Sequence, residues 1–260
     1  MPVNVKDPIN LMVYSPAGHG KTVLLGSGVG DARICPMLFL DFESGKMSIK
    51  SKIRVVSLDQ LKDGSKPTIN KIDVVEIHDW EDYEVVGDYL ASVEHPYKTI
   101  AIDSLSEVNY MNMEGAIENG KRARPSTHDA DIAEMQDYLR SYAQMRRLIR
   151  FYRDLPLHTI FSASAEIVND PGAKRERMWP LLNGKLRFEV PGLVDILGYL
   201  AVVGEGDELE RWLLTQPTDT HEAKDRTEGG KLGSHIVNPT LPKIFDLIYG
   251  EEKKHAPAES

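Results

Sequence analysis

Short apolar runs alternate with amphipathic segments along most of the chain. The run within residues 36–45 is continuously apolar before its polar end, as in strands that are buried on both faces of a parallel sheet. The predicted strands cover residues 11–14, 36–45, 73–78, 97–104 and 157–165. The predicted helices cover residues 21–27, 80–93, 105–117, 131–154 and 241–249. This order predicts an α/β fold with a mostly parallel central sheet flanked by helices.

The C-terminal third of the chain departs from this alternation. Residues 195–203 and 210–215 are apolar runs on either side of Gly204-Glu-Gly-Asp207, and this spacing predicts an antiparallel hairpin. We therefore expect antiparallel strands at the C-terminal side of the sheet. One domain is expected over residues 1–250, with a disordered tail over 251–260.

Three internal segments follow neither the helical nor the strand period. Residues 46–73 are charged, and we expect a loop-rich connection there. Residues 119–129 and 168–179 are rich in polar, basic, glycine and proline residues, and both are predicted to be long loops.

Composition limits the class of protein. A chain of 260 residues with 41% hydrophobic residues can bury a substantial core. Cys35 is the only cysteine, which excludes an intramolecular disulfide and a cysteine-based metal site. No apolar run is long enough to span a membrane, and no signal-peptide pattern is found, so we expect a cytoplasmic protein without a membrane partner. The net charge of −9 argues against indiscriminate polyanion binding but leaves room for a local basic site.

A glycine-containing loop joins the first predicted strand to the first predicted helix. Its sequence ends in Gly-Lys-Thr and fits the phosphate-binding P-loop pattern in the required strand–loop–helix context. The residues predicted to bind the nucleotide are Ser15, Pro16, Ala17, Gly18, His19, Gly20, Lys21, Thr22 and Val23. We refer to residues 15–22 as the nucleotide loop.

Each residue type in the loop has a chemical reason. Gly18 and Gly20 allow the backbone to turn N–H groups toward a phosphate. Lys21 can reach the β- and γ-phosphate oxygens, and the Thr22 hydroxyl can bind Mg²⁺. Ser15 stands where the pattern has its first glycine, and this is the one departure. The loop predicts ATP and Mg²⁺ as cofactors.

Carboxylates at the ends of two other predicted strands indicate which P-loop chemistry is present. Asp103 ends an apolar strand, the Walker B arrangement in which a carboxylate helps to hold Mg²⁺. Ser104 follows it, at the position where many ring ATPases carry the glutamate that activates water. A base must then come from elsewhere, and Glu43 is the best candidate because it follows the strand after the nucleotide loop. Lys21 and Glu43 are the predicted catalytic residues.

Two segments of the chain have features of other P-loop classes. Asn70-Lys-Ile-Asp73 matches the guanine-recognition motif of GTPases, but it precedes the Asp103 strand and lies in a loop-like region, so we interpret the match as coincidental. A P-loop kinase of a small acceptor is the second alternative, with the basic segment 119–129 as its arginine-rich lid.

The chain resembles the RecA-like P-loop ATPases over about residues 9–249. Residues 38–43 look like their second core strand with its catalytic glutamate, and 99–105 look like their Walker B strand. Residues 180–186, 194–199 and 223–227 are similar to later segments of that family. The compact form is most similar to phage-encoded nucleotide-binding proteins of the AAA domain class, some of which are minimal RecA-like single-strand annealing or recombination ATPases.

The resemblance implies further roles. A polar sensor would be Ser162 or Ser164, with Glu166 as a further option, and Lys185, Lys224 and Arg226 would reach a neighbouring subunit's nucleotide in a homo-oligomer. Two loops would face single-stranded DNA, with Trp179 stacking on a base. The cations of these loops are Lys121, Arg122, Arg124, Lys174, Arg175 and Arg177. A single-strand-binding or replication protein is an expected partner, and a helicase loader that binds protein rather than DNA is the alternative.

Overall fold

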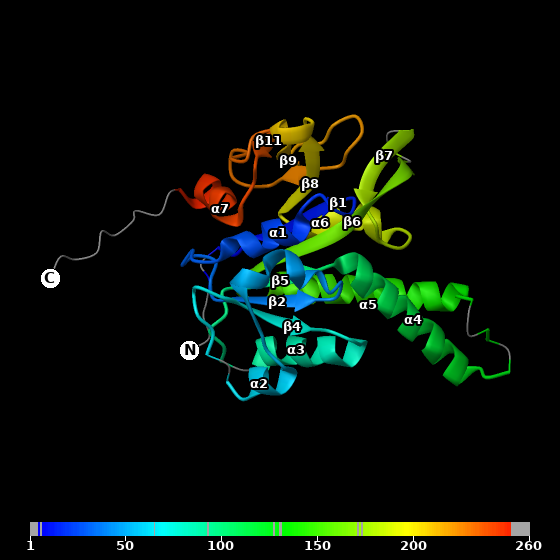
Figure 1. Ribbon diagram of the computed structural model, residues 1–260. Helices are drawn as coiled ribbons and strands as arrows, with labels where there is room; N and C mark the ends of the chain where they lie inside the picture. The colour runs from blue at the N-terminus through cyan, green and yellow to red at the C-terminus, as the bar shows by residue number, and fades with distance from the viewer. Residues whose placement is uncertain are drawn as a thin grey trace.

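In the computed structural model, the described residues are 5, 7–64, 66–92, 94–126, 128–129, 132–170, 172 and 174–250. Within them, eleven strands form one connected sheet with the main order β11-β9-β8-β1-β6-β5-β2-β4-β3 (Figure 1). The strands are β1 Asn10–Ser15, β2 Met37–Asp41, β3 Ile53–Val55, β4 Ile72–Glu76, β5 Thr99–Asp103, β6 His158–Asp170, β7 Arg175–Pro180, β8 Ile196–Val203, β9 Glu210–Leu214, β10 Lys224–Asp225 and β11 His235–Val237.

The helices cover both faces of this sheet. The α-helices are α1 Lys21–Leu25, α2 Leu58–Lys62, α3 Trp80–Ser92, α4 Leu105–Ala123, α5 Met135–Asp154, α6 Leu186–Leu193 and α7 Leu241–Tyr249. Short 3-10 turns are η1 Gly26–Gly28, η2 Gly45–Lys52 and η3 Gly206–Glu208. No helix in the described ranges is both long and apolar enough to cross a membrane.

Alternation along β1 shows how the layers form. Leu11 and Val13 are buried in the cluster that contains α1 and α7, whereas Met12 and Tyr14 are buried in the cluster of α3, α4, α5 and α6. Successive side chains of a strand point to opposite faces, so a strand with helices on both sides must be apolar throughout. All six residues of β1 are buried.

Parallel pairing dominates the centre of the sheet, and antiparallel strands extend its C-terminal side. β1 pairs in parallel with β6 and β8, and β5 pairs in parallel with β6 and β2. β8 and β9 form the predicted antiparallel hairpin, and β11 pairs antiparallel with β9. The predicted fold class is confirmed.

The prediction of a long loop over residues 119–129 is wrong in its first half. Helix α4 continues to Ala123, so Lys121 and Arg122 are helical and Arg124 caps the helix. The helix runs through Gly120. A Cβ at Gly120 would lie 2.5 Å from His128 Nε2 and 2.6 Å from Asp137 Oδ1, so this glycine permits close packing between α4 and α5. We call the projecting α4–α5 pair the arm (Figure 1).

The prediction of a polar loop over residues 168–179 is also wrong. β6 runs on to Asp170 and pairs antiparallel with β7 in a hairpin that projects on the same side as the arm (Figure 1). The turn between the strands contains Gly172 and Lys174, and Lys174 has a φ of 52°. The prediction failed because the segment is rich in charged residues, which are typical of loops. In the structure the largely buried Arg177 forms ion pairs with Asp170 and Glu222, so its charge is compatible with a strand.

Residues 46–73 contain more structure than the expected connection. They form η2, the edge strand β3 and α2, whose Ser57 cap accepts a hydrogen bond from Gln60 N. β3 was missed because it has only three residues and two of them are exposed. Residues 251–260, where a disordered tail is predicted, and residue 131, where the long helix is predicted to begin, lie outside the described residues.

Candidate functional site

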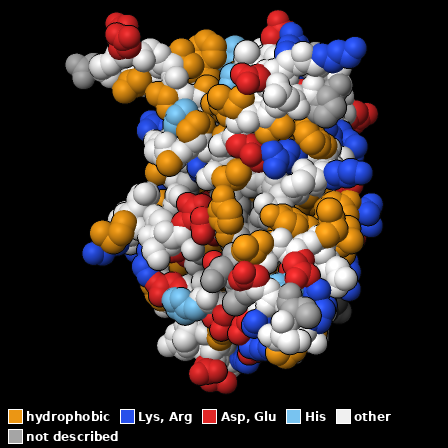
Figure 2. All heavy atoms as spheres, turned by 90° about the vertical axis from the view of Figure 1, so that its right-hand side faces the viewer, with side chains coloured by type: hydrophobic (Ala, Val, Ile, Leu, Met, Phe, Trp, Pro, Cys, Tyr) orange, Lys and Arg blue, Asp and Glu red, His pale blue; other side chains and the backbone are white. Residues whose placement is uncertain are grey.

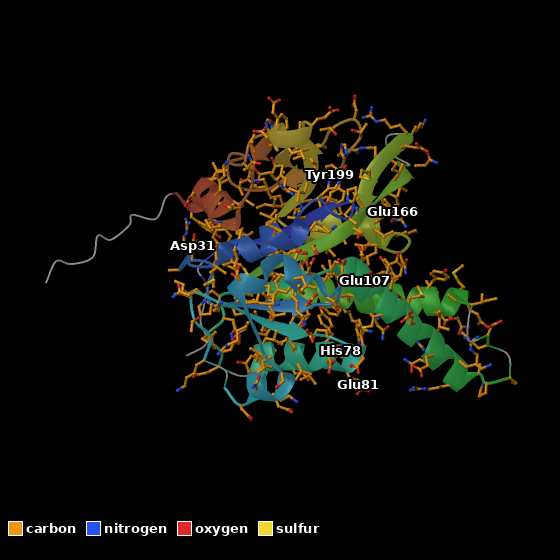
Figure 3. All side chains as sticks on the ribbon, in the orientation of Figure 1. Asp31, His78, Glu81, Glu107, Glu166 and Tyr199 are labelled. Atoms are coloured by element: carbon orange, nitrogen blue, oxygen red, sulfur yellow. The ribbon has the colours of Figure 1, made fainter. Side chains whose placement is uncertain are left out.

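The candidate site lies where β1, β5 and β2 end, next to the start of α1. The sheet order puts β6 between β1 and β5, so the nucleotide loop and Asp103 approach each other across β6. Figure 3 shows the same edge of the molecule, with Glu107 on the first turn of α4 and Glu166 on β6. Ligands of open α/β sheets bind outside the carboxyl ends of the strands, which is this edge.

The nucleotide loop has the conformation that its two glycines permit. Gly18 has a φ of 79° and Gly20 a φ of 99°, both in the left-handed region that favours glycine. Gly20 N-caps α1, and Leu24 N donates to its carbonyl at 2.9 Å. His19 Nδ1 lies 3.0 Å from the carbonyl of Leu200, which ties the loop to β8.

Ser15 explains why the missing first glycine is tolerated. It is the last residue of β1, pairs in register with Ser164 and is fully buried. Its backbone is not among those with positive φ. The left-handed turn begins only at Gly18, so a side chain at position 15 causes no strain.

Lys21 is the buried cation of the loop. Its side chain is 7% exposed, and Nζ donates to the carbonyls of Ser15 at 3.0 Å and Pro16 at 3.3 Å. Burial lowers the pKa of Lys21, and the nearby carboxylates of Glu43 and Asp103 oppose that shift. These carbonyls hold the ammonium under the loop, where it can turn to a phosphate.

Thr22 and Asp103 meet directly. Thr22 Oγ1 donates to Asp103 Oδ2 at 2.7 Å, and the hydroxyl of Ser162 donates to Asp103 Oδ1. Asp103 is fully buried, and burial raises its pKa despite these two hydrogen bonds. A buried carboxylate of this kind is stabilised in its charged form by a cation.

These oxygens fit Mg²⁺. A threonine hydroxyl and a carboxylate oxygen within 2.7 Å of each other are hard donors, and Mg²⁺ usually combines one or two carboxylates with substrate phosphates. In the described residues no group of three His, Cys, Asp or Glu side chains could hold a metal alone. Thr22 and Asp103 would therefore bind Mg²⁺ jointly with the phosphates of a nucleotide.

Glu43 reaches the same place from β2. The hydroxyl of Ser104, next to Asp103, donates to Glu43 Oε1. The turn that carries Glu43 is held by Asp41, which is 3% exposed and accepts a hydrogen bond from Gly45 N at 3.0 Å. A Cβ at Gly45 would lie 3.3 Å from Thr22 Oγ1, so this glycine leaves room beside the Mg²⁺ donors.

The two predicted sensor serines have different surroundings. Ser162 contacts Asp103 through its hydroxyl, whereas Ser164 is held through its backbone N–H by Ser106 Oγ at 2.9 Å. Glu166 forms an ion pair with Arg187 at 2.8 Å and lies further along β6. Of these three residues, the structure brings Ser162 to the Mg²⁺ donors.

The predicted trans-acting cations are not alike either. Lys224 Nζ donates to the carbonyls of Pro191 and Val194 of its own chain, and burial lowers its pKa to about 8. Its charge thus serves to hold β10 against the end of α6. Lys185 and Arg226 are exposed. Their action on a neighbouring subunit stays a prediction.

Most of the cations predicted to bind DNA have acidic neighbours. Arg122 pairs with Glu118, Arg124 with Glu134 and Arg175 with Asp219, and Arg177 pairs with both Asp170 and Glu222. Lys121 Nζ donates to the carbonyl of His128 at 2.8 Å. Lys174 is exposed at the tip of the β6–β7 hairpin. The face on this side shows basic and acidic side chains interspersed (Figure 2).

Burial corrects the expectation for Trp179 and explains the apparent guanine motif. Trp179 is 7% exposed and packs against Phe188 with ring centroids 4.9 Å apart, so it is not available to stack on a base. Asp73 of the apparent guanine motif is fully buried in β4, where it accepts hydrogen bonds from Arg54 and Tyr97. Asp73 therefore stabilises the fold, which agrees with the interpretation of the guanine-motif match as coincidental.

One residue at the loop was not found from the sequence. Arg211 of β9 donates from Nε to the carbonyl of His19 at 3.0 Å. The two residues are 192 positions apart, and the sequence offers no spacing or motif that links them. The pairing of β9 with β8, and of β8 with β1, brings them together.

Comparison with known proteins places this site in a family. The chain matches the model of the AAA domain over residues 7–227. Among curated proteins none matches. Solved structures that are similar include the flagellar accessory protein FlaH from Methanocaldococcus jannaschii, at a TM-score of 0.44 and 13% identity over 88% of this chain and 84% of that chain. A KaiC-like protein from Pyrococcus horikoshii OT3 has a TM-score of 0.43 and 13% identity over 92% of this chain and 99% of that chain.

The family match includes every part of the geometry described above. It spans the nucleotide loop, the Glu43 turn, Asp103 and Ser162, and it ends at Thr227 after β10. The chain belongs to the AAA domain family and has the fold of a nucleotide-binding P-loop ATPase.

Proposed function

We propose that this protein binds ATP with Mg²⁺ at the nucleotide loop and hydrolyses it to ADP and inorganic phosphate. The observation that carries the proposal is the 2.7 Å hydrogen bond from Thr22 Oγ1 to Asp103 Oδ2. This bond joins the end of the loop to the end of β5, so the Thr22 hydroxyl and the Asp103 carboxylate lie side by side. Glu43 stands beside that point through its contact with Ser104.

Binding uses the loop and its lysine. The N–H groups that Gly18 and Gly20 expose surround the phosphates, and the Lys21 ammonium exchanges the carbonyls of Ser15 and Pro16 for β- and γ-phosphate oxygens. Thr22 and Asp103 would hold Mg²⁺, which when bound would offset the charge of the phosphates. Ser162 keeps the Asp103 carboxylate in place.

Hydrolysis needs a base for the attacking water, and Glu43 supplies it. Glu43 is exposed, so water can reach its side chain. Ser104 fixes Oε1 by a hydrogen bond, and the carboxylate accepts the proton as water attacks the γ-phosphorus. The bond from the γ-phosphorus to the bridging oxygen of ADP breaks, ADP and inorganic phosphate leave, and the proton is then released from Glu43 to solvent.

Release of inorganic phosphate from ATP, with and without Mg²⁺ and without any acceptor, tests this function and separates it from a kinase. Glu43→Gln should lower kcat about a hundredfold while ATP binding changes less than a few-fold. Glu107→Gln is the matched control, because Glu107 is a nearby carboxyl whose pKa is raised by burial and by Glu43. An undiminished kcat for Glu43→Gln, or an equal loss in both variants, would contradict the role of Glu43.

We further propose that single-stranded DNA binds across the arm and the β6–β7 hairpin and couples to hydrolysis, as in recombination or annealing. Support comes from the projection of both elements on one side of the molecule (Figure 1). Because four of the six cations already have acidic partners, Lys121 and Lys174 carry most of the attraction. The salt dependence should then be shallow, with a slope of about −1 to −2 in log Kobs against log salt.

Replacing Lys121 and Lys174 together by Glu should weaken binding of an oligothymidylate and flatten this slope. The double change Arg122→Gln and Arg175→Gln is the control, since both arginines sit in exposed ion pairs. Unchanged affinity and slope in the lysine variant would contradict the proposed DNA site. DNA-stimulated phosphate release would also separate this proposal from a helicase loader that binds protein.

A further inference from the structure

Arg211 is a cation that the C-terminal strands deliver to the nucleotide loop. Its guanidinium Nε donates to the carbonyl of His19 at 3.0 Å. Its backbone is fixed by Asn238, whose Oδ1 accepts from Arg211 N at 3.0 Å and whose N–H donates to the Arg211 carbonyl at 2.6 Å. Both ends of the residue are therefore held in place.

Contact between Arg211 and the loop is close. A Cβ at Gly20 would lie 2.8 Å from Arg211 Nε and 3.4 Å from its Cδ. Gly20 therefore serves two purposes: its φ of 99° turns the loop, and its missing side chain leaves space for the guanidinium.

No acidic side chain in the described part of the chain pairs with the remainder of this guanidinium. Among the described residues, nine arginines form ion pairs with carboxylates, and Arg211 does not join them. These nine are Arg33, Arg54, Arg122, Arg124, Arg146, Arg153, Arg175, Arg177 and Arg187. With Nε bonded to the loop, the two terminal nitrogens keep their donors for another acceptor.

Arg211 reaches the loop from the side opposite the hydrolytic groups. In the sheet order, β8 and β9 lie on one side of β1, whereas β6, β5 and β2 lie on the other. Asp103 and Glu43 come from β5 and from the turn after β2. The nucleotide loop, at the end of β1, is thus bracketed by Arg211 on one side and by these carboxylates on the other.

We propose that Arg211 is a second phosphate-binding cation of this site and contacts the α- and β-phosphates that nucleoside di- and triphosphates share. This inference rests on the proposed function, because it places a nucleotide on the loop. The planar guanidinium matches phosphate oxygens, and a charge-assisted bond of this kind is strong. Because Arg211 and Glu43 lie on opposite sides of the loop, Arg211 contributes to nucleotide binding and does not take part in the attack of water on the γ-phosphate.

The test measures binding of ADP and of ATP with Mg²⁺ by calorimetry, and kcat and KM for phosphate release, in the full chain. Arg211→Gln should weaken ADP and ATP by a similar factor of about ten and raise KM by that factor, with kcat within about twofold. Arg211→Lys should recover most of the affinity because it keeps the charge. Arg147→Gln is the control: this exposed arginine also donates from Nε to a backbone carbonyl, that of Ala143, and should leave binding unchanged.

The outcomes separate the inference from the function on which it rests. Binding of ADP by Arg211→Gln within twofold of the unaltered protein would overturn the inference and leave the ATPase proposal intact. A loss of kcat at unchanged KM would also overturn it, because Arg211 would then act on the reaction rather than on binding. Absence of nucleotide binding by the unaltered protein would overturn both. Both Arg211 variants should have the far-ultraviolet circular dichroism and the thermal midpoint of the unaltered protein. This would show that a loss of affinity is not caused by unfolding.

Discussion

The nucleotide loop and the β6–β7 hairpin both hold a buried cation, but they treat it differently. In the loop, Lys21 is held by the neutral carbonyls of Ser15 and Pro16, and burial lowers its pKa. In the hairpin, Arg177 is 10% exposed and is held by the carboxylates of Asp170 and Glu222. A cation that is left without a fixed counter-charge is available to a ligand, whereas one with two counter-charges is part of the fold.

The largest effect should come from Lys21. Lys21→Met removes the cation proposed to contact the γ-phosphate, so the rate of phosphate release should fall about a hundredfold or more. This is the usual loss when one preorganised charge or donor is removed from an active site. The thermal midpoint should not fall, because a desolvated ammonium is replaced by an apolar side chain of similar length. Activity and thermal unfolding of the same sample check this. A marked loss of stability would mean that Lys21 also holds the fold together.

Arg177 should show the reverse pattern. Arg177→Met leaves the buried Asp170 and the half-buried Glu222 without this cation, and partial burial already raises the pKa of Glu222. We expect a loss of about 3 kcal/mol in the free energy of unfolding, measured by urea denaturation, with kcat of the folded protein little changed. Arg175→Met, which breaks an exposed pair with Asp219, should cost less than about 0.5 kcal/mol. Equal effects of the two variants would break the comparison.

Acid should destabilise the fold around β6, the strand that pairs with β1 and continues into the β6–β7 hairpin. His158 begins β6, is 2% exposed and accepts a hydrogen bond from Ile9 N, and burial lowers its pKa to about 4. The unfolded chain takes up this proton near pH 6.5, so the stability that His158 contributes is present above that pH and is lost as pH falls toward 4. The loss is about 3 kcal/mol across this window. Urea titrations of His158→Gln should lack that part of the pH dependence; an identical profile would contradict the assignment.

The smallest effect concerns two glycines whose surroundings differ, one in the arm and one in the nucleotide loop. Gly120→Ala should destabilise the arm by about 1–3 kcal/mol, because the new Cβ would overlap His128 and Asp137. Gly18→Ala meets open space and should cost only the strain of a left-handed residue, about 1 kcal/mol. Hydrogen exchange of the arm amides should increase in the first variant and stay unchanged in the second. Unchanged exchange in the Gly120→Ala variant would contradict the packing role of this glycine.

The structure brings the residues that local patterns singled out to one place, because they follow strand ends. Asp103 and Glu43 come at the ends of apolar runs, Lys21 and Thr22 follow the loop after another, and parallel strands bring their carboxyl ends to one edge. The two basic segments were predicted less well. Their charges indicated loops, but ion pairs such as Arg124–Glu134 and Arg177–Glu222 allow a helix and a strand to form there. Such pairs depend on partners that are distant in sequence or hidden by a turn.

By itself, the sequence determined the strand–loop–helix unit and predicted which residues stand at the strand ends beside it, Thr22, Asp103 and Glu43, because backbone propensity and apolar periodicity act over a few residues. Only the tertiary structure decided which cations are available. It showed that Lys224 is bound by its own chain, that Trp179 is buried and that Arg211 lies on the nucleotide loop. The physical reason is that the free energy of a charge depends on what surrounds it, and residues as far apart in sequence as His19 and Arg211, 192 positions, supply those surroundings.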